Sequence, residues 1–254
     1  MSEPYPDFVA RFYDPVYAQV RDGVDNAWYL ERMAEAKGPV LEIGSGTGRL
    51  LAEARRRGID AWGVDLSPAM AERCRSKLAP EDRDRVSVAD AVSLRTDRRY
   101  ALVCAPFRVL SHVFETADQL RLLDAVHDVL EPGGAFAFDL YVPSLKLLLE
   151  GMPETVDFDG EHAPGRRLRR VVSSRPADLS RQTNRVRMGF LWEEEDGEHR
   201  GEWEFEMRFF FRFEIEHLVA RSRLALETIH GDFAGGPLVA ESREYVVVCR
   251  RPGD

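Results

Sequence analysis

The sequence has 254 residues, 44% of them hydrophobic, and a net charge of -9 at pH 7. That length allows one large domain with a substantial buried core. The acidic balance argues against a nucleic-acid partner, because a phosphate backbone is bound by a basic surface. The basic run Arg166–Arg170 is interpreted as a solvated strand face.

The cysteines indicate a reducing compartment. There are three, at positions 74, 104 and 249, with no C-x-x-C pair and no histidine at metal-ligand spacing. This pattern favours free thiols and argues against a metal site. The first residues lack the basic and apolar regions of a signal segment, and no apolar run approaches membrane-spanning length. We therefore expect a cytoplasmic protein with no membrane partner.

Residues 5–37 are expected to form helices ahead of the first strand. Four residues recur at helical spacing before Pro15 interrupts the pattern: Phe8, Val9, Phe12 and Tyr13. A second helix is predicted over residues 27–36. On physical grounds alone, Tyr13 and Tyr17 are half-buried packing aromatics of the first helix.

A strand, a glycine turn and a helix are predicted over residues 40–57. The strand 40–44 is apolar and β-branched, and the helix 47–57 has helical spacing of apolar residues. Glycines stand at alternate positions of the turn, at 44, 46 and 48. Glycine tolerates positive φ and lets a ligand approach the backbone closely. The unit is typical of the first βα turn of nucleotide-binding folds.

The residues around this turn indicate the kind of nucleotide. A dinucleotide fingerprint requires a glycine at position 49, which is Arg49. Glu42, two residues before the first glycine, suits a cofactor with a positive charge, whereas a pyrophosphate is bound by bare N–H groups. The pattern therefore argues against a nicotinamide oxidoreductase.

Three further strands are predicted over residues 60–64, 85–88 and 100–105, with a helix over 68–78. This alternation predicts a parallel sheet with helices on both faces. The carboxyl ends of parallel strands meet at one edge, so four residues should gather there: Gly44, Asp65, Asp90 and Ala105. An acid at the tip of the second strand can accept both ribose hydroxyls of a nucleoside.

These features occur in the order found in one enzyme family. After Glu42, the glycines, Asp65 and Asp90 comes an L-x-P-G-G turn at residues 130–134. Over about 100 residues the sequence resembles the class I S-adenosylmethionine (SAM)-dependent methyltransferases. The resemblance implies SAM as cofactor, with Asp90 bonding the adenine amino group and Ala91 packing beside the ring. The cofactor residues it implies are Tyr13, Tyr17, Glu42, Gly44, Ser45, Gly46, Asp65, Leu66, Asp90, Ala91 and Ala105.

Two other segments narrow the resemblance. Residues 12–17 resemble the Y-D-x-x-Y segment of small-molecule N-methyltransferases, including those acting on deoxyamino sugars, where it closes over SAM. Residues 231–244 resemble the G-x-[FY]-x-G-x-P…S-R-E tail of methyltransferases of peptide and antibiotic amines, although an ordinary Gly-Pro-rich connection would look the same. The resemblance implies an amine acceptor, with Tyr13 and Tyr17 touching both cofactor and substrate.

The acceptor site is predicted beyond the fourth and fifth strands. Residues 105–107 read Ala-Pro-Phe instead of the N/D-P-P-Y/F clamp of enzymes that methylate adenine or glutamine amides, which argues against those substrates. His112 could take a proton from an ammonium acceptor, or could simply pack or cap a helix. Asp139 could hold a cationic amine or cap a helix near Pro143. The catalytic candidates are His112 and Tyr13, and the substrate-binding candidates are Phe107, Arg108, Asp139 and Tyr141.

Residues 154–212 depart from a minimal α/β fold. Apolar and charged residues alternate along two long runs, which predicts a three- or four-stranded antiparallel sheet with one buried face. The aromatic stripe of this segment is interpreted as that buried face and not as a surface for substrate stacking. The resemblance implies a lid or a dimer surface, so a homodimer is one expectation.

The predicted fold is α/β, with a doubly wound, mostly parallel seven-stranded sheet, N-terminal helices and an inserted antiparallel sheet. A helix over 117–130, a helix over 213–221 and strands over 224–229 and 244–250 complete it. The predicted units are a helical cap at 1–38, a SAM-binding core at 39–150, the insertion at 151–212 and the completion of the sheet at 213–254.

The expected function is methyl transfer from SAM to a small-molecule acceptor, with an amine nitrogen favoured. Orientation of the acceptor can contribute about 7–11 kcal/mol to such a displacement, so no metal is required. O-methylation of a hydroxyl or carboxylate, and a non-catalytic SAM-binding or partner-binding subunit, remain alternatives.

Overall fold

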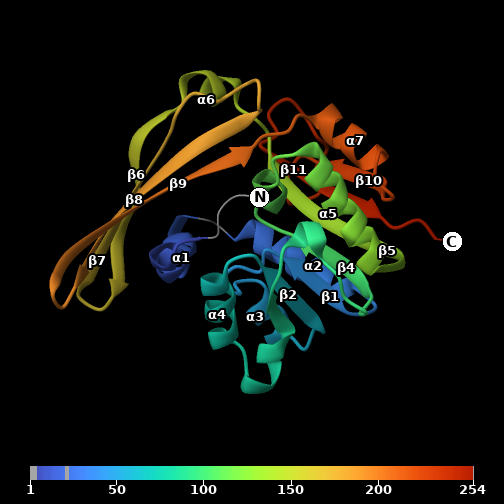
Figure 1. Cartoon of the computed structure of the whole chain (residues 1–254), viewed down its shortest axis with the longest axis horizontal. Coiled ribbons are helices and arrows are strands. Elements are labelled where there is room, and N and C mark those ends of the chain that lie inside the picture. The colour runs from blue at the N-terminus through green and yellow to red at the C-terminus, as the bar shows by residue number, and fades with distance from the viewer. Residues whose placement is uncertain (1–4, 21–22, 254) are drawn as a thin grey trace.

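The computed structural model describes residues 5–20 and 23–253, and its centre is a seven-stranded sheet (Figure 1). In the order β10-β11-β5-β4-β1-β2-β3, only β11 runs antiparallel to its neighbours. This confirms the predicted fold class. The strands are β1 (Val40–Ile43), β2 (Ala61–Asp65), β3 (Val86–Val88), β4 (Tyr100–Ala105), β5 (Leu130–Tyr141), β10 (Ala225–His230) and β11 (Glu244–Arg250).

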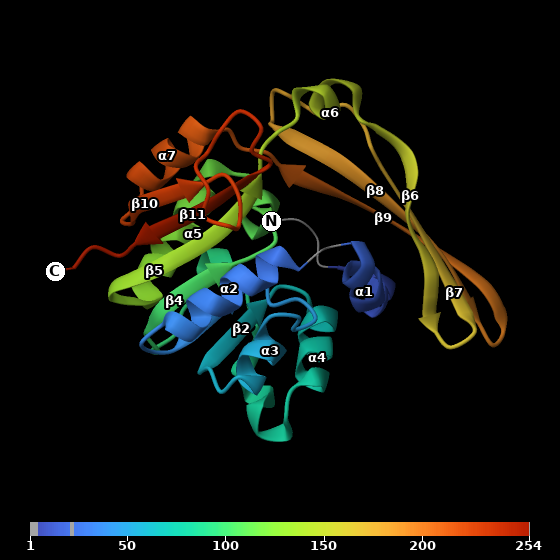
Figure 2. The same cartoon turned by 180° about the vertical axis from the view of Figure 1, so that it is seen from behind.

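Helices cover both faces of this sheet (Figures 1 and 2). One face buries apolar residues of α2 (Val24–Glu35), α3 (Leu51–Arg56) and α4 (Pro68–Lys77). The other buries those of α5 (Thr116–Val129) and α7 (Arg212–Ala220). Short 3-10 turns lie in the connections: η1 (Pro80–Arg85), η2 (Ala91–Ser93) and η3 (Val109–His112). Within the described ranges, no helix is both long enough and apolar enough to cross a membrane.

Several helix limits differ from the predicted ones, among them those of α2, and the differences in α1 and α3 have a clear physical cause. α1 spans Asp7–Val20 and continues through Pro15. A proline inside a helix removes a backbone hydrogen bond and crowds the preceding turn. The helix persists because it packs three buried residues against the inserted antiparallel sheet that is described below: Val9, Phe12 and Val16. α3 begins at Leu51 and not at residue 47, because Gly48 has a φ of 81°, which is not helical.

The inserted segment forms a separate antiparallel sheet in the order β6-β7-β8-β9. Its strands are β6 (Met152–Ala163), β7 (Arg166–Ser174), β8 (Thr183–Glu194) and β9 (Gly197–Arg208), preceded by α6 (Leu145–Glu150). The predicted period-two pattern is confirmed, with four strands. The long sheet curves past α1, which lies between it and the main sheet (Figures 1 and 2).

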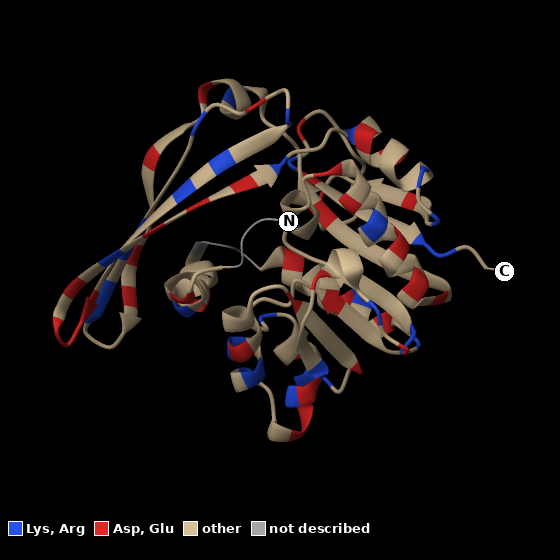
Figure 3. Cartoon of the chain, viewed as in Figure 1, with Lys and Arg blue, Asp and Glu red and all other residues tan. Residues whose placement is uncertain are grey.

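The two faces of the inserted sheet differ in chemistry. One face packs apolar side chains against α1: Phe158, Leu168, Met188, Phe190 and Trp203. Charged residues alternate along the same strands and form cross-strand ion pairs, such as Arg185 with Glu206 at 2.8 Å (Figure 3). The aromatic stripe is therefore a buried face, as predicted.

Arg170 corrects the interpretation of the basic run as solvated. Its residue is only 3% exposed, and its guanidinium pairs with Asp157 at 2.6 Å and lies 5.0 Å from the ring centre of Tyr17. Alternate residues of a strand share a face, so Arg170 lies on the same side of β7 as buried Leu168. The strand therefore brings one paired cation to α1.

Candidate cofactor and acceptor site

The glycine turn joins β1 to α3, and its glycines have φ angles of 72° at Gly44, 55° at Gly46 and 81° at Gly48. Only glycine adopts such angles readily. A Cβ on Gly44 would lie 2.6 Å from Val109, and one on Gly48 2.6 Å from the Sγ of Cys74, so both are closely packed. For a Cβ on Gly46, the nearest described atom beyond the adjacent residues would be the carbonyl oxygen of Gly44, at 3.9 Å. Gly46 therefore faces open space.

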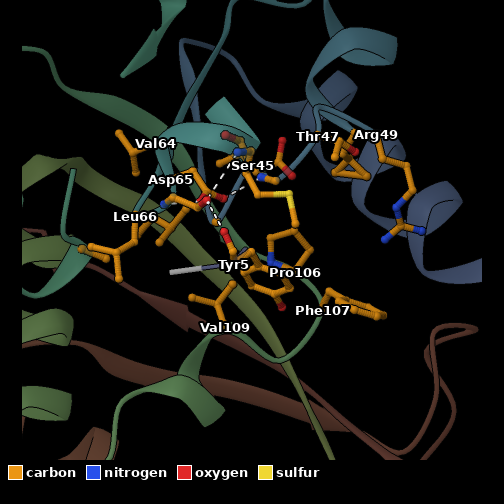
Figure 4. A pocket seen from close by; sticks show the side chains of 18 of the residues that line it. Tyr5, Ser45, Thr47, Arg49, Val64, Asp65, Leu66, Pro106, Phe107 and Val109 are labelled. Atoms are coloured by element: carbon orange, nitrogen blue, oxygen red, sulfur yellow. Dashed lines mark hydrogen bonds between the residues drawn. The ribbon is translucent and has the colours of Figure 1, made fainter. Parts of the chain in front are cut away.

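That space is a cavity at the carboxyl ends of β1 and β2 (Figure 4). Its empty volume is about 1000 Å³ with the open mouth included. Ten predicted site residues line it: Tyr13, Glu42, Gly44, Ser45, Gly46, Asp65, Leu66, Ala91, Phe107 and His112. The cavity thus joins predicted cofactor residues to predicted acceptor residues.

Glu42 places a buried carboxyl group in this cavity. It is 3% exposed, and within the described part of the chain its Oε2 has no hydrogen-bond partner. Burial raises the pKa of Glu42 to about 8; Arg49 opposes this rise and Asp65 adds to it. A buried acceptor without a partner is destabilising unless a ligand supplies one. The amino group and positive charge of SAM fit this requirement.

Asp65 ends β2 with its carboxylate held by the backbone (Figure 4). The N–H of Gly46 donates to Oδ2 at 2.7 Å, and the N–H of Ser67 donates to Oδ1 at 2.8 Å. Burial raises the pKa of Asp65, and these two bonds oppose the rise. Each carboxylate oxygen has a second lone pair, so the orientation leaves room for two further donors such as ribose hydroxyls.

Four rings in the lining, here called the aromatic wall, belong to Tyr5, Tyr13, Phe107 and His112. The Tyr13 ring centre lies 6.3 Å from that of Tyr5 and 6.4 Å from that of Phe107. The inserted sheet supports the wall, because the ring centre of Trp203 lies 4.5 Å from that of Tyr5 and the ring centre of Phe205 lies 6.1 Å from that of His112. Burial lowers the pKa of His112 to about 4, so its ring is neutral at pH 7.

Sequence reasoning missed several lining residues, chiefly Tyr5, Thr47, Arg49 and Met70. Tyr5 stands before the helical pattern and outside the Y-D-x-x-Y segment, so it carried no signal. Its carbonyl accepts a hydrogen bond from the Oγ of Ser67 at 3.4 Å, which ties the residues before α1 to the end of β2. Arg49 was noted only as the residue that breaks a dinucleotide fingerprint.

Six predicted site residues are outside the lining: Tyr17, Asp90, Ala105, Arg108, Asp139 and Tyr141. Asp90 caps η2, where its Oδ1 accepts the N–H of Val92 at 2.8 Å. Tyr17 packs on Tyr13, with ring centres 4.3 Å apart. Ala105 is buried at the end of β4. Contact of these six with cofactor or acceptor stays a prediction.

Asp139 is 1% exposed and has other partners than those considered from the sequence. Its Oδ1 accepts the hydroxyl of Tyr29 at 2.8 Å and the N–H of Phe107 at 2.7 Å. Burial raises the pKa of Asp139 to about 6, against the lowering effect of these two bonds. The cap of α6 is Ser144, so Asp139 does not cap that helix.

A family model described as a methyltransferase domain matches residues 40–134, from β1 into β5. Among curated proteins, the carboxy-S-adenosyl-L-methionine synthase of Yersinia enterocolitica is 28% identical over 142 residues, which is 53% of this chain and 51% of that protein. The chain spans about half the length of the curated relatives it matches.

Solved structures match nearly the whole chain. The CcbJ methyltransferase from Streptomyces caelestis is 25% identical with a TM-score of 0.78, covering 96% of each chain. The sugar N-methyltransferase KedS8 from Streptoalloteichus sp. is 22% identical with a TM-score of 0.74, covering 94% of this chain and 92% of that one, and shows the shared fold. With the glycine turn, these findings show that residues 40–134 match a methyltransferase domain and that the chain has the fold of solved methyltransferases.

The cofactor side of the cavity is tied to α1 by Asp14. Its Oδ1 accepts the hydroxyl of Thr47 at 2.6 Å, and its Oδ2 pairs with Lys77 at 2.6 Å. Thr47 belongs to the glycine turn and Lys77 to α4. Because Asp14 follows Tyr13 in the chain, this tie holds α1 and the Tyr13 ring beside the cavity.

We expect Asp14→Ala to weaken SAM binding about two- to tenfold, the net worth of one hydrogen bond. The reason is that α1 loses its tie to the glycine turn. Asp14→Asn keeps an oxygen for Thr47 and is the matched control, with a smaller expected loss. Isothermal titration of both variants measures the difference. Wild-type affinity in Asp14→Ala would mean that the tie does not hold the cofactor.

Proposed function

We propose that this protein transfers the methyl group of SAM to an amine nitrogen of a small-molecule acceptor. The observation that supports this proposal is a single cavity in which buried Glu42 and Asp65 meet the aromatic wall. SAM, when bound, supplies a methyl group on a positively charged sulfur. The residues of the chain bind it, orient the acceptor and exclude water.

On the cofactor side, Glu42 would receive the amino group of SAM and Asp65 its ribose hydroxyls. Gly46 would leave the space that the cofactor fills. Leu66 and Ala91 line the same cavity and would pack against the adenine ring of SAM. The buried carboxylates interact strongly with a cation, because the surrounding protein screens charge less than water does.

On the acceptor side, His112 would accept a hydrogen bond from the amine and direct the nitrogen lone pair toward the methyl carbon. A neutral amine can attack without first losing a proton, whereas a hydroxyl needs a base to activate it. A histidine with a pKa near 4 is a poor base at neutral pH. This reasoning favours nitrogen over oxygen, and KedS8 is itself a sugar N-methyltransferase.

We expect His112→Ala to lower kcat about tenfold, less than the 10²–10⁴-fold loss typical of a true general base. The loss should be uniform from pH 6 to 9, because the ring is neutral throughout that range. His112→Asn keeps a hydrogen-bond acceptor and should recover part of the rate. Steady-state kinetics against pH measure this. A loss confined to low pH would instead assign His112 the task of removing a proton.

The function itself is tested by incubating the protein with SAM and matched pairs of amines and their hydroxyl analogues. The products are read by mass, one added methylene for each methyl transferred, together with formation of S-adenosylhomocysteine. Methylation of amines alone supports the proposal, and methylation of the hydroxyl analogues alone contradicts it. Tight SAM binding without turnover on any acceptor would favour a non-catalytic subunit.

A further inference from the structure

The corner that follows β4 has an unusual backbone. Phe107 and Arg108 are consecutive residues with φ angles of 62° and 65°. Among the residues that the structure describes, the only other non-glycine residue with positive φ is Gln182. The left-handed conformation is unfavourable for a residue with a Cβ. It persists only where the surrounding structure holds it, often at functional sites.

Two sets of contacts hold this corner. Asp139, from β5, accepts the N–H of Phe107 at 2.7 Å, and the hydroxyl of Tyr29 from α2 donates to the same oxygen at 2.8 Å. The Arg108 guanidinium pairs with Glu244 from β11 at 3.0 Å and lies 5.2 Å from the ring centre of Tyr141. Hydrogen bonds to a carboxylate are stronger than those to a neutral acceptor. The strain at the corner is therefore balanced by two charged anchors, buried Asp139 and the half-buried Arg108–Glu244 pair.

The corner sets the position of one ring of the aromatic wall. Phe107 meets Tyr17 edge to face, with centres 5.3 Å apart, and Arg49 of the glycine turn lies 5.6 Å from its ring centre (Figure 4). Phe107 thus lies where α1, the glycine turn and the acceptor side of the cavity converge. A shift of this ring would change the acceptor space and leave Glu42 and Asp65 in place.

We propose that Asp139 is a positioning residue, which acts on acceptor binding by holding the Phe107–Arg108 corner and does not itself bind the amine. The proposal rests on the proposed function, and it replaces the role that the sequence suggested for this acid. Asp139 is too buried to touch an acceptor in this structure, being 1% exposed, and the two hydrogen bonds described above both go to protein groups.

The kinetic test compares Asp139→Ala, Asp139→Asn, Phe107→Ala and the Asp139→Ala/Phe107→Ala double variant. For Asp139→Ala we expect kcat/KM for the acceptor to fall about 10- to 100-fold, as small misplacements do, with the Kd for SAM within about twofold. Asp139→Asn keeps an oxygen for both donors and should retain most activity. The double variant should lose no more than Phe107→Ala, because Asp139 acts through that ring. Additive losses, or a parallel loss of SAM affinity, would overturn the proposal.

Hydrogen exchange tests the same proposal without an acceptor. The Phe107 amide should be protected in the wild type and in Asp139→Asn, and should exchange faster in Asp139→Ala at unchanged protection elsewhere. Tyr29→Phe, which removes only one of the two donors, gives a milder variant if Asp139→Ala does not fold. Unchanged exchange at Phe107 would overturn the positioning role. An inactive wild type with this exchange pattern would instead contradict the proposed function alone.

Discussion

Replacing Gly46 with valine is expected to abolish detectable SAM binding while the protein stays folded. The Cβ would lie 3.9 Å from the carbonyl oxygen of Gly44, its nearest described neighbour, so the fold has room for the side chain and the valine methyl groups would occupy the cavity that the cofactor requires. The φ of 55° adds strain, because β-branched residues rarely adopt it. Isothermal titration with SAM measures the loss, and thermal melting verifies the fold.

Two other glycines separate the possible causes of that loss. Gly58 has a φ of 77° and open space around its Cβ position, but it does not line the cavity. Gly58→Val should therefore carry the backbone strain without any change in Kd. Gly48→Ala should instead lower the melting temperature, because its Cβ would collide with Cys74 of α4. Wild-type affinity in Gly46→Val would place the cofactor elsewhere.

The sequence predicted the main sheet well because its signals are local. β4 and β11 have the predicted limits, since each is a short apolar run bounded by polar residues. The glycine spacing was equally informative, because glycine adopts the three positive φ angles of this turn far more readily than any residue with a Cβ. Because parallel strands end at the same edge of a sheet, an acid at the end of β2 was expected to lie beside that turn.

Contacts between distant segments could not be predicted in the same way. Asp139 and Tyr29 are 110 positions apart, and nothing near either residue marks them as partners. Tyr5 lines the cavity and packs against Trp203 of the inserted sheet, a contact that nothing near either residue marks. Pro15 was expected to interrupt α1, because the sequence shows the destabilising effect of a proline inside a helix. The packing of α1 on the inserted sheet, which offsets that effect, is not visible in the sequence. These are tertiary effects that override local preference.

The second large effect concerns the charge of Glu42. Because burial raises its pKa from 4.5 to about 8, the carboxyl is mostly protonated at pH 7 in the empty cavity. In the unfolded chain Glu42 ionises near pH 4.5, whereas in the folded protein it stays protonated up to about pH 8. The unliganded protein therefore loses stability as the pH rises from about 4.5 to 8. Glu42→Gln cannot ionise, and its melting temperature should lack this part of the decline. Thermal melts of both proteins across that range measure the difference.

SAM binding should reverse this preference, because its positive charge favours the ionised carboxylate. The wild-type protein should then release a proton from Glu42 on binding SAM at pH 7, and its affinity should rise with pH and level off near pH 8. Arg49 and Asp65 are the charged groups that face Glu42 and remain in both proteins.

Glu42→Gln should release almost no proton from this site and bind SAM more weakly by about 1.5–3 kcal/mol at pH 8. The amino group of SAM also titrates near pH 8, and the glutamine variant reports that background. Titration calorimetry in buffers of different ionisation enthalpy counts the protons. Equal proton release by the two proteins would show that Glu42 does not face the cofactor's charge.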